Sequence, residues 1–395
     1  MARSVVGMEA LGRRLCENPV ESSAEKAMKI TRVEPILYDA GLKRVWLFVK
    51  VHTDAGVVGI GEGTTTEPFM AEAVMRRIGE TLIGEDPARI QDLWQRTYTR
   101  WFNVRGGPLV LAALSGIEHA LWDIKGKVAN LPVYEFLGGK LRDRVPVYAN
   151  HMFFGGLNDP RAYAERAAEA VERGYSAVKI DPFGDARGDI DRASLAKACA
   201  MVAAVRDAIG PDRDVAIDTH AKFGVGGAVK VAHAVEQFDP YFVEEPVAPE
   251  NLDALRRVRE LVNVRIATGE RIYTKFGFQA LLASQACEIV QVDVAHCGGV
   301  LEARFIAAMA ESHYVQVAPH SWYGPISLAA SLHVDATIPN LLIQETPVPH
   351  VMPPKQSELL STPLQADRGV LSVPTGPGLG VAFDEAVLAR NTIRP

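Results

Sequence analysis

Three carboxylates at a regular interval are the clearest chemical signal in the second half of the chain. Glu244 comes 26 residues after Asp218, and Glu270 comes 26 residues after Glu244. Each closes a short apolar run of the kind that forms a buried strand. Neighbouring strands lie about 4.8 Å apart, so three adjacent strand ends can bind one cation from the same side. All-oxygen donors suit Mg²⁺, and like charges this close repel one another without a cation. The sequence therefore predicts a Mg²⁺ site at Asp218, Glu244 and Glu270.

Further ionisable side chains close other apolar runs in the same half of the chain. They are Lys179, His220, Asp293, His320 and Glu345. Ionisable side chains at buried strand ends lose the hydration of their charged forms. This loss of free energy is not compensated unless the residues form a functional site. His220 lies two residues after Asp218 and hence on the same side of its strand. Asp293 beside His320 would fix the imidazole tautomer and raise its pKa towards that of a general base.

The elements that must position these residues alternate along the chain. Eight short apolar runs occupy residues 145–148, 177–180, 215–217, 241–243, 264–267, 289–292, 315–317 and 341–343. The gaps between them have helical periodicity, for example over residues 162–173 and 228–238. Such alternation predicts parallel strands closed into a TIM-like barrel, where the strand ends meet at one mouth. We assign residues 145–350 to this catalytic barrel.

The first part of the chain has strands before helices. Residues 45–51 and 57–60 form a hairpin signature around the turn at residues 52–56, and helical patterning follows over residues 71–83 and 109–127. Residues 28–144 are therefore predicted to form an α+β domain, on which the loop-rich segment 351–395 packs. Residues 1–27 lack the apolar core of a secretory signal and are expected to be a disordered extension.

Composition narrows the classes of function. The chain has 395 residues and a formal net charge of −6, which argues against a nucleic-acid surface. Its four cysteines show no zinc-like spacing, as expected in a reducing cytoplasm, and no apolar run approaches the roughly 20 residues that span a bilayer. A small anionic substrate remains compatible with the net charge, because a bound cation reverses the local sign.

Several motifs resemble those of one family. The runs Val243–Pro246 (VEEP) and Thr268–Glu270 (TGE), with Asp218 upstream, resemble the metal-binding signature of the enolase superfamily. The runs 120–127 and 137–139 resemble the helix and linker that lead from its capping domain into the barrel. The resemblance extends from about residue 28 to the C-terminus. It implies an α/β fold, with a (β/α)₇β modified TIM barrel and an N-terminal α+β capping domain completed by the C-terminal segment. It also implies a homo-oligomer.

Within the superfamily, the acid and base residues resemble those of the mandelate racemase/muconate lactonizing enzyme-like proteins. Asp293 and His320 match the Asp–His dyad that acts at the α-carbon, and Glu345 matches the glutamate that hydrogen-bonds the developing enediolate. Lys179 fits the first lysine of a Lys-x-Lys pattern, but Asp181 replaces the second lysine. Asp218-Thr219-His220 matches the Asp-x-His of acid-sugar dehydratases, in which the histidine protonates a departing hydroxyl.

The resemblance implies an acid-sugar dehydratase, a carbon–oxygen lyase. We expect His320 to remove the α-proton of an aldonate or aldarate, and His220 to help expel the 3-hydroxyl, which gives a 2-keto-3-deoxy acid. A racemase, epimerase or cycloisomerase is the nearest alternative, because Asp181 can also move protons. A metal-dependent hydrolase lacks its expected His-x-His at the first strand, and a non-catalytic binding protein has little need of these residues.

Overall fold

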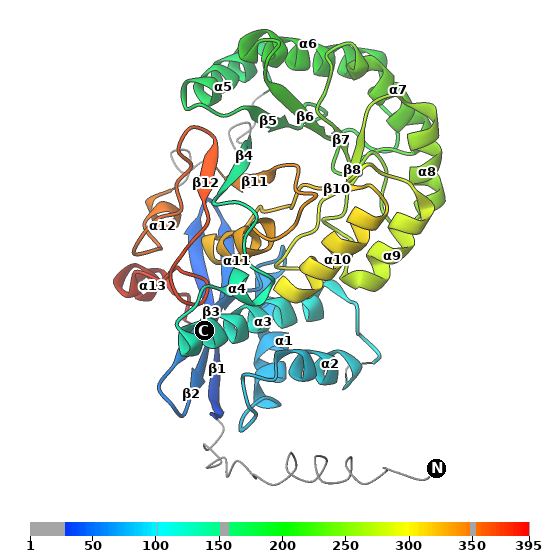
Figure 1. Cartoon of the computed structure of the whole chain (residues 1–395). Helices are drawn as coiled ribbons and strands as arrows, with labels where there is room; N and C mark the ends of the chain where they lie inside the picture. The colour runs from blue at the N-terminus through cyan, green and yellow to red at the C-terminus, as the bar shows by residue number, and fades with distance from the viewer. Residues whose placement is uncertain (1–27, 101, 151–157, 348–352, 395) are drawn as a thin grey trace, which may run out of the picture.

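The computed structural model describes residues 28–100, 102–150, 158–347 and 353–394. The expected extension 1–27 and His151 lie outside the described residues. Figure 1 shows two parts, a small sheet with helices beside it and a ring of helices around inner strands. The fold class predicted from the sequence, a modified TIM barrel with an α+β capping part, is confirmed.

The capping part is an antiparallel meander followed by helices. Strands β1 (Ile30–Gly41), β2 (Arg44–Thr53) and β3 (Val58–Glu62) pair in that order. Helices α1 (Pro68–Glu80), α2 (Ile90–Arg100), α3 (Pro108–Ala129) and α4 (Val133–Phe136) come next. The hairpin and two of these helices were expected from the sequence. The full length of β1 and the helices α2 and α4 were not predicted.

Strand β3 packs on α3 with backbone against backbone. A Cβ atom at Gly59 would lie 2.0 Å from the carbonyl oxygen of Ala120, and one at Gly61 would lie 1.9 Å from that of Gly116. Real Cβ contacts are never this short, so alternate glycines are required on this face of the strand. The close approach fixes α3 directly over the sheet, and α3 then leads into the barrel.

The barrel consists of eight parallel strands. They are β4 (Arg144–Asn150), β5 (Ala177–Ile180), β6 (Asp214–Asp218), β7 (Val243–Glu244), β8 (Ile266–Thr268), β9 (Ile289–Val290), β10 (Gln316–Val317) and β11 (Gln344–Pro347). Each pairs with the next along the chain, β11 pairs with β4, and a bridge from Val317 to Leu341 joins the last two strands. The eighth strand therefore begins as predicted at residue 341, but its regular ladder with β4 runs over residues 344–347.

Helices cover the outside of the barrel (Figure 1). They are α5 (Pro160–Glu172), α6 (Arg192–Ile209), α7 (Val225–Glu236), α8 (Leu252–Leu261), α9 (Thr274–Ser284), α10 (Val300–Ser312) and α11 (Pro325–Asp335). Inside, the side chains of Ala177, Ala216 and Ala267 leave room for the rings of Tyr148 and Phe242, whose centroids lie 6.3 Å apart. The bottom of the barrel is thus a packed core, and the open space lies at the carboxyl ends of the strands.

The C-terminal segment returns to both parts. Strand β12 (Val370–Ser372) pairs antiparallel with β4, while α12 (Pro354–Ser357) and α13 (Glu385–Asn391) pack beside β1. The Gln356 amide donates to the carbonyl oxygen of Ala40, and the Leu379 N–H donates to Asp123 of α3.

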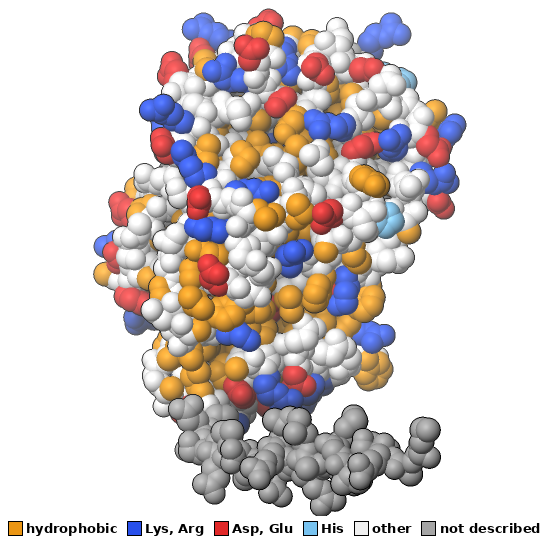
Figure 2. Space-filling view, viewed as in Figure 1, with side chains coloured by type: hydrophobic (Ala, Val, Ile, Leu, Met, Phe, Trp, Pro, Cys, Tyr) orange, Lys and Arg blue, Asp and Glu red, His pale blue; other side chains and the backbone are white. Residues whose placement is uncertain are grey.

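Charged side chains of both signs are interspersed over the face seen in Figure 2. In the described ranges, every helix is too short or too polar to cross a membrane.

Two buried glutamates of the capping part bind the amino ends of two barrel helices. Glu62, at the end of β3, accepts hydrogen bonds from the backbone N–H groups of Gly324 (2.6 Å) and Ser327 (2.9 Å) at α11. Glu118, on α3, accepts from those of Val300 (2.8 Å) and Leu301 (3.0 Å) at α10. Free N–H groups at a helix start favour a carboxylate. The capping part is therefore attached to the barrel by charge at two consecutive helices.

This attachment predicts a pH-dependent stability. Burial raises the pKa of both Glu62 and Glu118 to about 7, although their hydrogen-bond donors lower it. The unfolded carboxyl ionises near its ordinary value, so between that value and about 7 the folded state binds more protons, and stability falls as pH rises. We expect the melting temperature to fall between about pH 5 and about pH 8 less steeply in E62Q and E118Q than in the unaltered protein. Equal slopes in all three proteins would contradict this.

Candidate active site

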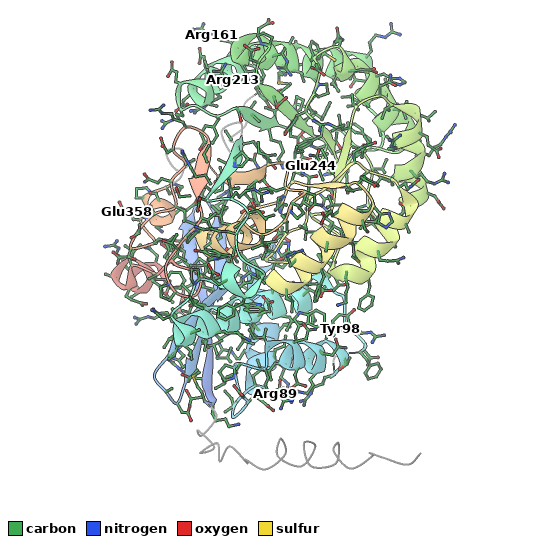
Figure 3. All side chains as sticks on the ribbon, viewed as in Figure 1. Arg89, Tyr98, Arg161, Arg213, Glu244 and Glu358 are labelled. Carbon is green, nitrogen blue, oxygen red and sulfur yellow. The ribbon has the colours of Figure 1, made fainter. Side chains whose placement is uncertain are left out.

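A cavity of about 720 Å³ lies where the carboxyl ends of the barrel strands face the capping part. From the barrel it is lined by Asn150, Lys179, Asp218, His220, Glu270, Arg271, Tyr273, His296, His320, Trp322, Tyr323 and Glu345. From the capping part it is lined by Thr65, Thr66, Glu67, Met70, Pro108 and Leu109. Six of the eight predicted site residues therefore line one cavity. The other two, Glu244 and Asp293, are buried beneath it, and Figure 3 shows Glu244 inside the ring of helices.

Lys179 lies at the centre of the carboxylates. Its Nζ is 2.9 Å from Glu244 Oε2, 3.1 Å from Glu345 Oε1 and 3.6 Å from Asp218 Oδ2. The strand register explains this convergence, because Asp218 of β6 pairs directly with Glu244 of β7, and Lys179 of β5 precedes them in the sheet. Burial lowers the pKa of Lys179, but Glu244 and Glu345 outweigh burial and raise it well above its ordinary value. Lys179 is therefore an ammonium ion.

The donor chemistry of the three predicted ligands fits a hard cation. Burial, and then Asp218, raise the pKa of Glu244 to about 8, and burial also raises that of Asp218. Burial is the largest cause of both shifts, so the desolvated site disfavours the negative charge of these carboxyl groups when no cation is bound. Among the described residues, no three His, Cys, Asp or Glu side chains are arranged so that they could hold a metal ion. Protein cations contact each carboxylate instead, and Glu270 lies 3.1 Å from Arg271 and 3.3 Å from His320.

Asp293 and His320 form the predicted dyad. Asp293 Oδ2 lies 2.6 Å from His320 Nδ1, and the two residues share a parallel β-bridge. The other ring nitrogen, Nε2, lies 3.3 Å from Glu270 and 3.8 Å from Glu345. Burial lowers the pKa of His320, but Glu270 and Glu345 raise it to about 10. The ring is thus fixed by Asp293 on one side and directed towards the cavity on the other.

His296 connects this dyad to the capping part. Its Nε2–H donates to the carbonyl oxygen of Thr64 (2.7 Å), and its Nδ1 lies 3.5 Å from Asp293. The ring of Tyr323 stands edge-on to His296 at 4.9 Å and to His320 at 6.2 Å between centroids. The sequence alone left the role of His296 open, because its only local signal is its place three residues after Asp293.

His220 belongs to a second Asp–His pair. Its Nδ1 lies 2.6 Å from Asp181 Oδ2, and its Nε2 lies 3.2 Å from Asp218 Oδ2. Lys222 donates to the same oxygen of Asp181. Burial lowers the pKa of His220, but Asp218 and Asp181 outweigh it and raise that pKa. Lys222 is therefore placed against Asp181.

The loop that follows β3 buries some of its polar side chains and directs others to the cavity. Glu62 and Thr64 are buried and bonded to one another at 2.8 Å, while Arg105 stacks near the ring of Tyr98. Thr65, Thr66 and Glu67 line the cavity instead. At a strand end a shift of one residue reverses the direction of the side chain, which the sequence pattern does not resolve.

Two family descriptions match the chain. The mandelate racemase/muconate lactonizing enzyme N-terminal domain matches residues 37–138, and the enolase C-terminal domain-like family matches residues 162–387, more than half of the chain. The chain belongs to the enolase superfamily. The resemblance drawn from the VEEP and TGE runs is thereby confirmed.

The relatives of this enolase-superfamily chain include acid-sugar dehydratases. It is 37% identical to the D-gluconate dehydratase of Thermoproteus tenax over 93% of this chain and 74% of that protein. It is 38% identical to the D-galactonate dehydratase of Variovorax paradoxus over 93% of this chain and 95% of that protein. The crystal structure of an enolase-superfamily member from Salmonella Typhimurium superposes with a TM-score of 0.87 at 31% identity, over 93% of this chain and all of that chain.

The position of Lys179 predicts a cation-dependent stability. Removing one partner from a buried ionic group costs about 3–5 kcal/mol, because the remaining charges stay buried without compensation. We expect K179M to lower the melting temperature in metal-free buffer, and millimolar divalent cation to restore part of the loss.

The control is K140M, since Lys140 lies at the surface, where it pairs with Asp143 and stands 5.3 Å from the ring centroid of Tyr134. Pairs of this kind contribute little to stability, so K140M should melt like the unaltered protein. A metal-free K179M protein as stable as the unaltered one would show that the carboxylates do not depend on Lys179.

Proposed function

We propose that this protein is a Mg²⁺-dependent dehydratase of a sugar acid, an aldonate or aldarate, which yields a 2-keto-3-deoxy acid. The observation that carries the proposal is that two histidines line one cavity and each is held through Nδ1 by its own aspartate. One histidine can accept the α-proton while the other supplies a proton to the departing hydroxyl. The names of the dehydratase relatives support the same reaction.

Asp218, Glu244 and Glu270 would hold the Mg²⁺ ion. Enolase-superfamily sites combine a lysine or histidine base with one or two Mg²⁺ ions. The bound ion would supply positive charge for the carboxylate and 2-hydroxyl of the substrate and for the enediolate derived from them. The all-oxygen donor set at three neighbouring strand ends supports this assignment. Arg271 lies 3.1 Å from Glu270 and 3.0 Å from Glu245.

The first step would be loss of the α-proton to His320. Its Nε2 is the ring nitrogen that is not bonded to Asp293, so this atom would receive the proton. Positive charge bound at Glu270 would offset the negative charge that raises the pKa of His320 and leave Nε2 free to accept it. The electron pair moves into the substrate carboxylate, and Lys179 lies where an ammonium can stabilise that charge. Glu345 is held by the N–H of Ser321 (2.8 Å) and by the Asn150 amide, so it can hydrogen-bond the enediolate. Donors directed at developing charge act most strongly in such a water-poor site.

The second step would be elimination. The electron pair returns to form the double bond between C2 and C3, the C3–O bond breaks, and the Nε2–H proton of His220 leaves with the hydroxyl as water. The resulting enol tautomerises to the 2-keto-3-deoxy acid. A racemase or epimerase needs proton-transfer groups on both faces of C2. That alternative is less well supported, since Asp181 takes the place of the second lysine and is bonded to His220 rather than lining the cavity.

A substrate screen tests the proposed function. We expect one or two aldonic or aldaric acids to give a 2-keto acid in the presence of Mg²⁺, detected as a semicarbazone. E244Q should lower turnover by about 10²–10³-fold, because it removes a charge at the ion site. E302Q is the matched control, since Glu302 is also a buried glutamate bonded to a lysine, at 3.0 Å from Lys275, but lies outside the cavity. Full activity of E244Q, or of the protein without divalent cation, would contradict the proposal.

Hydrogen exchange at C2 tests the assigned base. In D₂O the unaltered protein should exchange the α-proton of its substrate, and H320N should lose this exchange by roughly 10²-fold or more, because a positioned base contributes that much. Proton nuclear magnetic resonance of the recovered substrate measures it. Unchanged exchange in H320N would assign the base to another residue. Exchange without any keto acid would instead favour the epimerase alternative.

A further inference from the structure

Asp181 is held at both carboxylate oxygens. Oδ1 accepts the backbone N–H of Phe183 at 3.1 Å, and Oδ2 accepts from His220 Nδ1 at 2.6 Å and from Lys222. The hydroxyl of Tyr163 donates to the carbonyl oxygen of Asp181 at 3.0 Å, which fixes the backbone as well. A carboxylate bound on both oxygens has little freedom to rotate. Its contact with His220, which is 39 residues away in the chain, is therefore a defined one.

The backbone of His220 is held in an unusual conformation. His220 and Ala221 have φ angles of 47° and 54°, in the left-handed region that costs a non-glycine residue about 1–2 kcal/mol. Two hydrogen bonds hold this turn: the His220 N–H donates to Asp218 Oδ1 at 2.7 Å, and the Ala221 N–H donates to the carbonyl oxygen of Glu245 at 2.9 Å. Such strain persists where the surroundings impose it, commonly at a functional site. The turn and Asp181 together leave the His220 ring one orientation.

Of this group only His220 lines the cavity, and its Nε2 lies 3.2 Å from Asp218 Oδ2 at the cavity wall. Of the described residues that line the cavity, His220 is one, whereas Asp181 and Lys222 are not among them. The arrangement parallels the other side of the site, where Asp293 lies beneath His320 at the same distance of 2.6 Å. An aspartate behind a histidine keeps the proton on the near nitrogen and directs the far nitrogen outward. Asp181 is therefore placed to act through His220 and not on the substrate.

We propose that Asp181 is the positioning residue of the leaving-group acid: it holds His220 through Nδ1 and presents Nε2 to the 3-hydroxyl of the sugar acid, and Lys222 anchors it from behind. The assignment rests on the proposed dehydratase function. In the elimination, the proton leaves His220 Nε2 with the hydroxyl oxygen, the C3–O pair departs as water, and the ring remains with its Nδ1 proton bonded to Asp181. Asp181 itself gains no proton.

The test separates three reactions of the same active site. They are exchange of the α-proton in D₂O, dehydration of the sugar acid, and loss of fluoride from its 3-deoxy-3-fluoro analogue. Fluoride leaves as an anion and needs no general acid, whereas hydroxide does. In D181N we expect dehydration to fall on the order of 10²-fold, in line with the contribution of a positioned acid, mainly in kcat. Exchange and fluoride release should stay near the rates of the unaltered protein.

A double-mutant cycle tests whether Asp181 acts through His220. H220N should reproduce the pattern of D181N, and D181N should cause no further loss in the H220N background, because residues that act as a unit are non-additive. D181E, which keeps the carboxylate, should recover part of the dehydration. D189N is the control for loss of a nearby carboxylate, since Asp189 lies in the same loop, is exposed and pairs with Lys230. It should dehydrate at the full rate.

Each outcome has one meaning. Full dehydration by D181N, or additive losses in the double mutant, would overturn the positioning role. Loss of α-proton exchange in D181N would make Asp181 a base and would also overturn it. If D181N lost all three reactions equally and melted at a lower temperature, Asp181 would have only a structural role, and the positioning role would be wrong. An unaltered protein that exchanges the α-proton but dehydrates no sugar acid would overturn the proposed function, and this assignment with it.

Discussion

The structure depends on the concentration of like charge at the desolvated mouth of the barrel. Parallel strands bring Asp218 and Glu244 into direct register, with Glu270 following the next strand, and burial prevents water from screening them. Three buried carboxylates this close together are stable only if positively charged groups contact them. In this chain the ammonium of Lys179 enters from the preceding strand, while His320 and Arg271 contact Glu270. The positions of the catalytic candidates are thus determined by the electrostatic needs of the carboxylates.

The same principle joins the two parts of the molecule. Glu62 and Glu118 reach out of the capping part and take the place of solvent at the amino ends of α11 and α10. A carboxylate there both satisfies free N–H groups and interacts favourably with the helix dipole. Beside these contacts, His296 ties the carbonyl oxygen of Thr64 to the Asp293–His320 dyad. The loop that lines the cavity with Thr65, Thr66 and Glu67 is therefore held by the same residues that support the acid and base groups.

In the proposed reaction the two histidines would have different tasks on the same scaffold. Both are held through Nδ1 by an aspartate, but their surroundings differ. The side chain of His320 is only 10% exposed and lies next to Glu270 and Glu345, whereas that of His220 is 36% exposed and stands on a strained turn. An enclosed imidazole suits proton abstraction from carbon, and a more open one suits a hydroxyl that must leave as water. The replacement of a second lysine by Asp181 fits this division, because that position now serves the second histidine.

The sequence by itself determined the fold class, the number and order of the barrel strands, and six of the 18 residues that line the cavity. It could do so because strand and helix periodicities are local features of the sequence. Ionisable groups at buried strand ends are also energetically unfavourable unless they form a functional site. It did not determine the partners of Asp181, Lys222 or His296, nor that Thr65 to Glu67 rather than Glu62 and Thr64 face the cavity. His296 and Thr64 are 232 residues apart, and no local pattern relates them. The packing of the capping part on the barrel decided these contacts. The direction of a side chain at a strand end depends on which neighbouring residue can bury it or satisfy its hydrogen bonds.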